Sequence, residues 1–381
     1  MTPRAMRRLR DLAEHVREST SPTSEDTRRY VGLEHLVSGD PSIAGWAPAS
    51  SVRSSKFVFR PGDTLYGKLR PYLDKAAMAE FEGVASTDLL VLRPKEGVDP
   101  RFLTYTMHSR SVIEHAIATT VGVNHPRTSW SSLGELEVYA PLLEEQRRIA
   151  RILSTIDQAK QSRQRVLVAA RQTCDAMLKS LFAEMTPAAT IGDIGVVKGG
   201  KRLPKGHAFA SAETPYPYIR VVDLADGSVR TTDLRYLEPE DQARISRYVI
   251  TQDDVYISIA GTIGLVGVIP AALDGANLTE NAARIVIKDR TKIGNHFLAW
   301  YLRSPMGQAE IRVRTTKTSQ PKLALMRIKD IPIPFPPLEE QQRTVQILST
   351  IHGFCEAVRR EVEALDKVFH ATMKSLLEPT P

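Results

Sequence analysis

The sequence has few residues of the kinds that would indicate secretion, disulfide stabilisation or membrane insertion. Its 381 residues include only two cysteines, Cys174 and Cys355, which lie far apart in helical patterns, so no disulfide framework is predicted. The basic segment 1–20 has no apolar core and does not resemble a signal peptide. We therefore expect a protein of a reducing compartment, the cytoplasm.

One long uncharged run, residues 255–273, is the exception to this pattern. A membrane helix of about 20 residues is one interpretation of such a run. However, Gly261, Gly264, Gly267 and Pro270 interrupt it, and β-branched residues fill it. We predict two buried strands joined by a glycine turn, and no membrane partner.

Motifs for catalysis are also lacking. Residues 195–202, "GVVKGGKR", are close to a phosphate-binding loop, but Arg202 stands where Ser or Thr should hold Mg²⁺. Pro204 follows where a helix should run. The sequence has no Cys/His cluster with metal-ligand spacing and no Gly-x-Ser-x-Gly segment. We expect no catalytic residue, no metal site and no cofactor of this chain's own.

What the chain does have is a normal globular composition with a basic balance. Hydrophobic residues make up 42% and charged residues 25%, and the length fits two or three domains. The net charge is +7. A basic chain of this kind is compatible with a polyanionic partner.

A long internal repeat organises the sequence. Residues 141–157, "PLLEEQRRIARILSTID", recur as residues 336–352, "PPLEEQQRTVQILSTIH", an offset of 195 positions. At the same offset, residues 102–146 align with 297–341 without a gap. A period this long indicates a duplicated domain rather than a solenoid.

Each repeat has the same predicted plan and belongs to the α/β (α+β) class. A mixed region with short apolar strands comes first, followed by a short amphipathic helix, a polar turn and a strand that ends in prolines. A long helix closes each repeat, at roughly 143–184 and 338–378. At 1.5 Å per residue, each long helix would span about 60 Å.

Both long helices have a heptad stripe of apolar residues, which is typical of a coiled-coil seam. The first stripe comprises Ile149, Ile152, Ile156, Ala159, Val166, Ala170 and Met177. The second comprises Ile347, Ile351, Phe354, Val358, Leu365 and Val368. Because the stripes match in length and register, we predict that the two helices pair with each other. Two unrelated core helices are the alternative.

Basic and polar segments bent by Gly or Pro are candidate DNA-contacting surfaces, since Arg and Lys neutralise phosphates and Asn, Gln and Arg pair with base edges. In the first repeat, the candidates in segment 51–75 are Arg53, Lys56, Lys68, Arg70 and Tyr72. The polar turn 119–130 adds Asn124, His125 and Arg127.

The second repeat has corresponding candidates. Its polar turn, 312–322, contains Lys317, Ser319, Gln320 and Lys322, and Lys322 aligns with Arg127. The basic loop 198–205 and nearby segments contribute Lys198, Lys201, Arg202, Lys205, Arg220 and Thr262. Taken singly, any of these could be an ordinary solvated loop. Their equivalent position in both repeats favours a function.

With these segments in view, the chain resembles the specificity subunits of type I restriction-modification systems. The resemblance rests on the doubled "LEEQ" segment with its long helix, and on "GKRLPKG", "YPYIRVVDL", "SIAGTIG" and "SQPKL". It covers the whole chain, although the first repeat matches more loosely, with "VNHPRTSW" in place of "SQPKLALM". His352 replaces Asp157 of the first copy, which we expect to be a surface change.

The resemblance implies two target-recognition domains, 1–142 and 187–337, each recognising half of a split double-stranded DNA sequence. Spacer helices 143–186 and 338–381 would form an antiparallel coiled coil related by a pseudo-two-fold axis. The helix starts would dock methyltransferase subunits, expected to be two, through Glu144, Glu145, Gln146, Arg148, Glu339, Glu340, Gln341 and Arg343.

S-adenosylmethionine, ATP and Mg²⁺ would belong to the partner subunits, which include an ATP-driven restriction subunit. The setting would be the cytoplasm of a bacterium or archaeon. Two alternatives remain open at this point: a DNA-binding adaptor of another phage-defence system, and a nuclease fused to a specificity module.

Overall fold

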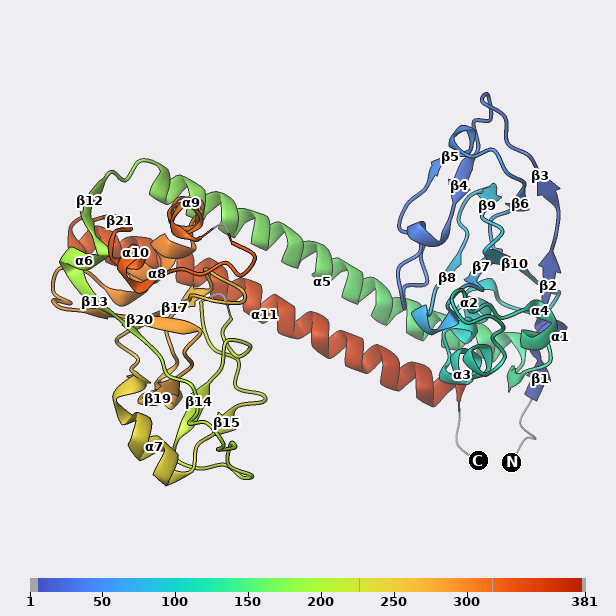
Figure 1. The fold of residues 1–381 in the computed structure, drawn as a ribbon. Helices are drawn as coiled ribbons and strands as arrows, with labels where there is room; N and C mark the ends of the chain where they lie inside the picture. Colours follow the sequence, from blue (N-terminus) through green and yellow to red (C-terminus); the bar gives the residue numbers. More distant parts are fainter. Residues whose placement is uncertain (1–5, 226, 317, 379–381) are drawn as a thin grey trace. The chain divides into compact units, whose positions relative to one another are not determined.

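The computed structural model describes residues 6–225, 227–316 and 318–378 (Figure 1). The chain divides into two compact units. Unit 1 comprises Met1–Gln164 and Arg360–Pro381, and unit 2 comprises Arg165–Arg359. Each unit therefore contains one mixed α/β domain together with one end of each of the two long helices.

A four-stranded antiparallel sheet forms the base of unit 1. Its strands, in spatial order, are β2 (Ala13–Val16), β10 (Leu89–Pro94), β7 (Thr64–Gly67) and β8 (Ala76–Met78). β10 is apolar at every position from Leu89 to Leu92, and all four residues are buried. Since side chains alternate across a strand, they supply two separate cores on the two faces of the sheet.

Unit 1 also contains a five-stranded sheet and several short elements. The sheet order is β3 (Ser19–Thr20), β6 (Lys56–Phe59), β9 (Gly83–Ala85), β4 (Arg29–Val31) and β5 (Ala47–Pro48), with β4 and β9 parallel. β1 (Met6–Arg8) pairs with β11 (Glu137–Tyr139). The helices are α1 (Leu9–Leu12), α2 (Pro100–Met107), α3 (Arg110–Ala118) and α4 (Trp130–Leu133), with 3₁₀ turns η1 (Leu33–His35), η2 (Ala49–Ser51) and η3 (Pro71–Leu73).

Unit 2 has two four-stranded sheets. The first is antiparallel, in the order β13 (Gly195–Gly199), β20 (Ala282–Ile287), β17 (Val255–Ser258) and β18 (Val266–Gly267). The second is β15 (Arg235–Tyr236), β14 (Pro217–Ile219), β19 (Ala276–Leu278) and β16 (Val249–Ile250), with β14 and β19 parallel.

The remaining elements of unit 2 are a strand pair and short helices. β12 (Pro187–Thr190) pairs with β21 (Pro332–Pro334). The helices are α6 (Ile191–Ile194), α7 (Pro239–Ile245), α8 (Asn295–Arg303), α9 (Pro305–Arg314) and α10 (Leu325–Lys329), with 3₁₀ turns η4 (Ser246–Tyr248) and η5 (Ala271–Leu273). Strands β17 and β18 confirm the prediction for the uncharged run 255–273, because Tyr256 pairs with Gly267 across a turn that contains Gly261 and Gly264 at positive φ.

The duplication reaches further than the sequence alignment. The order β2-β10-β7-β8 in unit 1 matches β13-β20-β17-β18 in unit 2, with the same antiparallel pairing. In the second sheet, the parallel pair β4·β9 corresponds to β14·β19. The two domains in front of the long helices therefore share the order of the first sheet and the parallel pair of the second, in which unit 1 has five strands and unit 2 has four. Their sequences align only from Phe102 and Phe297 onward.

The two long helices are α5 (Leu143–Ala183) and α11 (Leu338–Leu377). In unit 1, Ile149 and Leu153 of α5 pack with Phe369 and Met373 near the end of α11. In unit 2, Leu178 near the end of α5 belongs to the same core as Leu348 near the start of α11. The start of each helix thus lies beside the end of the other, so the predicted antiparallel coiled coil is confirmed.

The heptad stripe predicted for α11 has two sets of residues, each repeating every seven positions. The set with Val358 faces the partner helix, but in the set with Phe354 and Val368 the buried residue is the next one along the chain. In α11, Val358 is 2% exposed, as predicted. Phe354 and Val368, however, are 52% and 50% exposed, while their neighbours Cys355 and Phe369 are 6% and 2% exposed. At each of these sites two apolar residues are adjacent, and a 3.5-residue period alone does not decide which of them faces the partner.

Candidate nucleic-acid interface

In unit 1, the structure brings together the two segments that the sequence singled out separately. The backbone N–H of Arg70 donates to the Pro126 carbonyl at 2.8 Å, and the N–H of Thr128 donates to the Lys68 carbonyl at 3.1 Å. Leu69 and Arg127 form a bridge. The end of β7 and the polar turn therefore make one continuous surface, with Arg70 and Arg127 exposed and Lys68 half-buried.

Strained backbone flanks the exposed aromatic residue of this surface. Arg70 and Asp74 have φ of 53° and 46°, in the left-handed region that non-glycine residues rarely occupy. They enclose η3, which leaves Tyr72 55% exposed. Two hydrogen bonds of Asp74 hold the turn. Its carboxylate Oδ1 lies 2.7 Å from His108 Nδ1, and its carbonyl accepts from the Gly39 N–H at 2.8 Å. Such strain persists only where surrounding bonds fix it, and it is common at functional surfaces.

The polar turn of each unit is closed at the same two aligned positions. In unit 1, Val121 and Arg127 exchange backbone hydrogen bonds of 3.0 and 3.1 Å. In unit 2, the Thr316 N–H donates to the Lys322 carbonyl at 3.0 Å, and the Lys322 N–H donates to Thr316 Oγ1 at 2.9 Å. The residues between the closing pair are displayed outward: Asn124 and His125 in unit 1, and Ser319 and Gln320 in unit 2, are exposed.

Backbone hydrogen bonds join three candidate segments of unit 2 in series. The Lys201 N–H donates to the Leu278 carbonyl at 2.8 Å, and the Ile259 N–H donates to the Asn281 carbonyl at 2.8 Å. The Leu323 N–H then donates to the Ile259 carbonyl at 3.0 Å. The basic loop, the glycine turn that carries exposed Thr262, and the polar turn are therefore linked to one another beyond the carboxyl ends of β13 and β17. No helix is present in residues 201–225, directly after Lys201, which agrees with rejecting a phosphate-binding loop.

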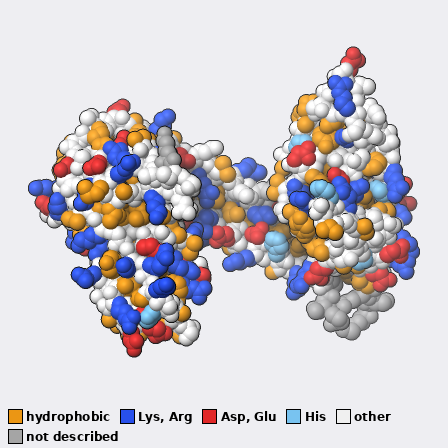
Figure 2. Space-filling view, in the orientation of Figure 1, with side chains coloured by type: hydrophobic (Ala, Val, Ile, Leu, Met, Phe, Trp, Pro, Cys, Tyr) orange, Lys and Arg blue, Asp and Glu red, His pale blue; other side chains and the backbone are white. Residues whose placement is uncertain are grey.

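The charged groups of these surfaces are partly paired. Arg127 Nε donates to Asp88 Oδ1 at 3.0 Å, and Arg202 Nε donates to Glu280 Oε1 at 2.7 Å. Lys198, Lys201 and Lys205 are exposed. Figure 2 shows Lys and Arg side chains spread over the visible faces of both units rather than gathered in a single patch. Lys317 lies outside the described residues.

Two basic candidates do not belong to these surfaces. Lys56, expected to be exposed, is 5% exposed, and its ammonium donates to the Ser54 carbonyl at 2.9 Å. Arg220 donates two hydrogen bonds to the Asp223 carboxylate, at 2.9 and 2.7 Å, and these bonds raise the pKa of its guanidinium. Lys56 is buried and Arg220 is half-buried, and each cation is already bonded within its own unit. Arg53 is exposed, but it precedes β6 of the five-stranded sheet, whereas Lys68 follows β7 of the other sheet.

The sequence predicted a polar turn over the whole of 312–322, but the first part of this segment is helical. Arg312 and Arg314 lie in the last turn of α9, which runs to Arg314. The polar turn proper starts only after this helix. Basic residues in the last turn of a helix stabilise its carbonyl end, so these two arginines have a structural role of their own.

The predicted docking residues divide into an exposed and a buried set. Glu144, Arg148, Glu339, Glu340 and Arg343 are exposed, and Glu145 is half-buried. Gln146 and Gln341 are each only 1% exposed, and their amides bond to backbone of their own unit. Because both side chains are buried and bonded to backbone, direct docking through these two glutamines is not supported by their position, and it stays an untested prediction. Their heptad position beside Ile149 and Thr344 could have indicated this burial.

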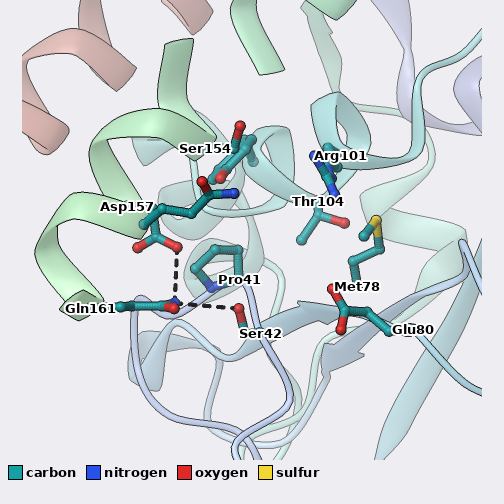
Figure 3. A pocket seen from close by; sticks show the side chains of 11 residues that line it. Pro41, Ser42, Met78, Glu80, Arg101, Thr104, Ser154, Asp157 and Gln161 are labelled. Atoms are coloured by element: carbon teal, nitrogen blue, oxygen red, sulfur yellow. Dashed lines mark hydrogen bonds between the residues drawn. The ribbon is translucent and has the colours of Figure 1, made fainter. Parts of the chain in front are cut away.

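Asp157, expected at the surface, lines a cavity of about 150 Å³ between α5 and the domain of unit 1 (Figure 3). It is 4% exposed, and burial raises the pKa of its carboxyl. Gln161 Nε2 donates to Asp157 Oδ2 at 3.0 Å, while Oδ1 has no hydrogen-bond partner among the described residues. In unit 2, His352 at the aligned position packs edge-on against Trp300, with ring centroids 5.6 Å apart.

Two features of the described residues bear on other kinds of function. Among them, no group of three or more His, Cys, Asp or Glu residues is arranged to hold a metal ion. No described helix has the length and apolar character needed to cross a membrane.

Comparison of the sequence with known proteins identifies a family. Residues 4–167 and 188–364 match the type I restriction modification DNA specificity domain. The type I restriction enzyme MjaVIII specificity subunit of Methanocaldococcus jannaschii is 23% identical over 317 residues, covering 78% of this chain and 74% of that protein. The EcoBI specificity subunit of Escherichia coli is 27% identical over 159 residues, covering 42% of this chain and 33% of that protein.

Solved structures share the fold. The S subunit of a type I restriction-modification system from M. genitalium matches with a TM-score of 0.65 at 16% identity, covering 100% of this chain and 98% of that one. A chain from a study of assembly and conformational transition in a type I system matches with a TM-score of 0.58 at 19% identity, covering 99% and 98%. The family match spans most of the sequence, and the chain therefore belongs to the family of type I restriction-modification DNA specificity domains.

Proposed function

We propose that each unit recognises one half of a bipartite double-stranded DNA target, and that the chain thereby gives a type I restriction-modification complex its sequence specificity. The observation that carries this proposal is the closed polar turn at the same aligned positions in both units, Val121–Arg127 and Thr316–Lys322, each beside a second exposed basic segment. Membership of the specificity-domain family supports the same role.

The side chains of the two surfaces fit two kinds of DNA contact. Lysine and arginine neutralise phosphates without reading sequence, whereas Asn and Gln form paired hydrogen bonds with adenine in the major groove. Asn124 and Gln320 are therefore the candidates for base contacts. The candidates for phosphate contacts and other polar or stacking contacts are Lys68, Arg70, Tyr72, His125, Arg127, Lys198, Lys201, Arg202, Lys205, Thr262, Ser319 and Lys322. Arg53, which is exposed beside the other sheet of unit 1, is a separate candidate.

The recognition domains in this proposal are residues 1–142 and 187–337, and the spacers are residues 143–186 and 338–381. The first turns of α5 and α11 carry charges at aligned positions, although the ion pairs differ: Arg148 bonds to Glu145 at 2.7 Å, and Arg343 bonds to Glu339 at 3.5 Å. Two equivalent surfaces on one chain would dock two methyltransferase subunits. The chain itself would catalyse nothing, and S-adenosylmethionine, ATP and Mg²⁺ would bind the methyltransferase and restriction subunits.

Genome-wide mapping of methylated adenine, in a host that expresses the chain with its methyltransferase, tests the main proposal. A split motif with a fixed gap is the expected result. Methylation without any motif, or a motif with a single uninterrupted half, would contradict bipartite recognition.

Two substitutions in the polar turn of unit 2 then test the surface. Gln320→Ala should weaken binding by about 1–3 kcal/mol and relax base choice at one position of one half-site. Lys322→Ala should weaken all sequences alike, and should lower the slope of log affinity against log salt by about 0.9. Binding titrations at several salt concentrations, on the mapped duplex and singly altered duplexes, measure both effects.

Lys367→Ala is the matched control for Lys322→Ala. Lys367 is also exposed but belongs to the long helix α11 and to none of the candidate DNA-contacting segments, so its loss should leave affinity and salt slope unchanged. Both turn variants should still assemble with the methyltransferase. If both keep full affinity and base preference, the turns are ordinary solvated loops.

Two other functions were open from the sequence. Incubating the purified chain with plasmid DNA and Mg²⁺ tests for a nuclease, and intact plasmid is the expected result. A methyltransferase that co-purifies with the chain would distinguish a restriction-modification subunit from an adaptor of another defence system.

A further inference from the structure

One glutamine near the start of each long helix is buried and bonded only to backbone. Gln146 Oε1 accepts from the Asp99 N–H at 3.0 Å, and its Nε2 donates to the Pro141 carbonyl at 2.7 Å and the Gly97 carbonyl at 3.4 Å. Each amide can make four hydrogen bonds, so three in a buried site leave little unsatisfied. The side chain is fixed in one orientation.

Gln341 makes the same three bonds in unit 2. Its Oε1 accepts from the Gly294 N–H at 3.0 Å, and its Nε2 donates to the carbonyls of Lys292 and Pro336, both at 2.8 Å. Every partner stands 195 positions after its counterpart in unit 1. Two of the three partner residues differ in type between the units, yet the bonds are the same because all of them go to backbone groups.

Each glutamine ties together three segments of its unit. Pro141 and Pro336 lie just before the long helices, whereas Asp99 and Gly294 are the N-cap residues of α2 and α8. The first turn of the long helix is thereby held to the first turn of the amphipathic helix. This second helix is the one that packs against the distal end of the other long helix, as Tyr105 does against Phe369 with ring centroids 6.0 Å apart.

We propose that Gln146 and Gln341 are positioning residues for bipartite recognition: each sets the orientation of its recognition domain on the helix pair, and together they set the spacing that the two half-sites must have. This inference rests on the proposed function. We do not expect these glutamines to contact DNA, since both side chains are buried and their amides bond to backbone of their own unit. Their loss should therefore affect how the two half-sites are combined and leave base choice within each half-site intact.

Gln341→Met is the variant that tests the inference, because methionine has a similar length but can form none of the three bonds. Gln346→Met is the matched control, as Gln346 is an exposed glutamine one turn further along α11. Both are prepared as the full chain assembled with methyltransferase subunits. Binding is measured to the methylation-mapped duplex and to duplexes with one base pair added to or removed from its gap.

The wild-type complex and Gln346→Met should prefer the natural gap. In Gln341→Met, the ratio of affinity for the natural gap to affinity for the altered gaps should fall at least about tenfold, because three hydrogen bonds that hold the start of α11 to the domain are lost and the domain can reorient. Base preference at each half-site position should not change. If Gln341→Met does not fold, Gln341→Asn, which keeps the amide on a side chain one methylene shorter, replaces it.

An unchanged gap preference in a folded variant would overturn the inference. So would a loss of methyltransferase binding with gap preference intact, since that would make Gln341 a docking residue after all. Failure of the proposed function looks different: the wild-type complex itself would show no gap preference.

Discussion

Two phenylalanines on α11 provide a direct test of how the long helices pair. Phe354 lies on the stripe that the sequence pattern predicts, yet it is 52% exposed, whereas Phe369 is off that stripe and 2% exposed. The same substitution to alanine can be made at both. The structure and the sequence pattern predict opposite rankings of the two costs.

The expected magnitudes follow from burial and contacts. Phe369 packs in a cluster with Ile149 and Leu153, stacks edge-on with Tyr105, and lies 4.9 Å below the Lys160 ammonium. Removing such a ring should cost about 3–5 kcal/mol, because the enclosed site cannot collapse fully. Phe354→Ala, at an exposed site, should change stability by no more than about 0.5 kcal/mol.

Urea-induced unfolding of the full chain, followed by far-UV circular dichroism, measures the difference. With an m value of about 2 kcal/mol/M, a loss of 3–5 kcal/mol lowers the midpoint of the unit 1 transition by about 1.5–2.5 M. Phe354→Ala should leave the unit 2 midpoint within about 0.25 M of wild type. If Phe354→Ala proves as costly as Phe369→Ala, the helices pair in the register of the sequence stripe, and the packing described above is wrong.

Three further predictions concern the buried carboxylate, the modularity of the chain and the helix pair. Burial raises the pKa of Asp157 above its unfolded value, so this group contributes stability below the unfolded pKa of about 3.9 and loses that contribution as pH rises through its folded pKa. Asp157→Asn should therefore raise the thermal midpoint at pH 7 and give no gain near pH 4, and a gain that persists at pH 4 would contradict the assignment. Exchanging residues 1–140 for those of a relative should change one half of the methylation motif, and a change in both halves would contradict separate recognition. Inserting seven residues after Gln164 and seven after Arg359 adds about 10.5 Å of helix and keeps the heptads in register, so the gap in the mapped motif should grow by about three base pairs; an unchanged gap would show that the helices do not set it.

Local sequence signals predicted the elements well where one signal was decisive. Glycine spacing in 255–273 identified β17 and β18, because an uncharged run broken every three residues cannot continue as a helix. The prolines before Leu143 and Leu338 marked the starts of α5 and α11. The heptad stripe was wrong where apolar residues were adjacent, as at Val368 and Phe369, and also at Ala159, which is exposed between Gln158 and Lys160.

The site was harder to predict because residue type does not reveal bonding partners. Lys56 and Arg220 were chosen as basic residues in polar surroundings, but their roles depend on Ser54 and on Asp223 in the fold. The strand order within the recognition domains could not be predicted from the sequence either. The first sheets of both domains have the same strand order, which the sequence did not predict because strands need only apolar alternation, and many sequences satisfy that.

The glutamines suggest why the repeat is strongest at the helix starts and weak in the domains. A bond from a side chain to a backbone group does not depend on the residue that carries the backbone group, as Gly97 and Lys292 illustrate. A domain can therefore change its sequence at loops and strands and still be held in place, provided that one glutamine and the chain path around it are kept. The two domains are proposed to contact different DNA sequences from equivalent positions. An attachment through one glutamine and backbone groups allows the other residues of each domain to differ.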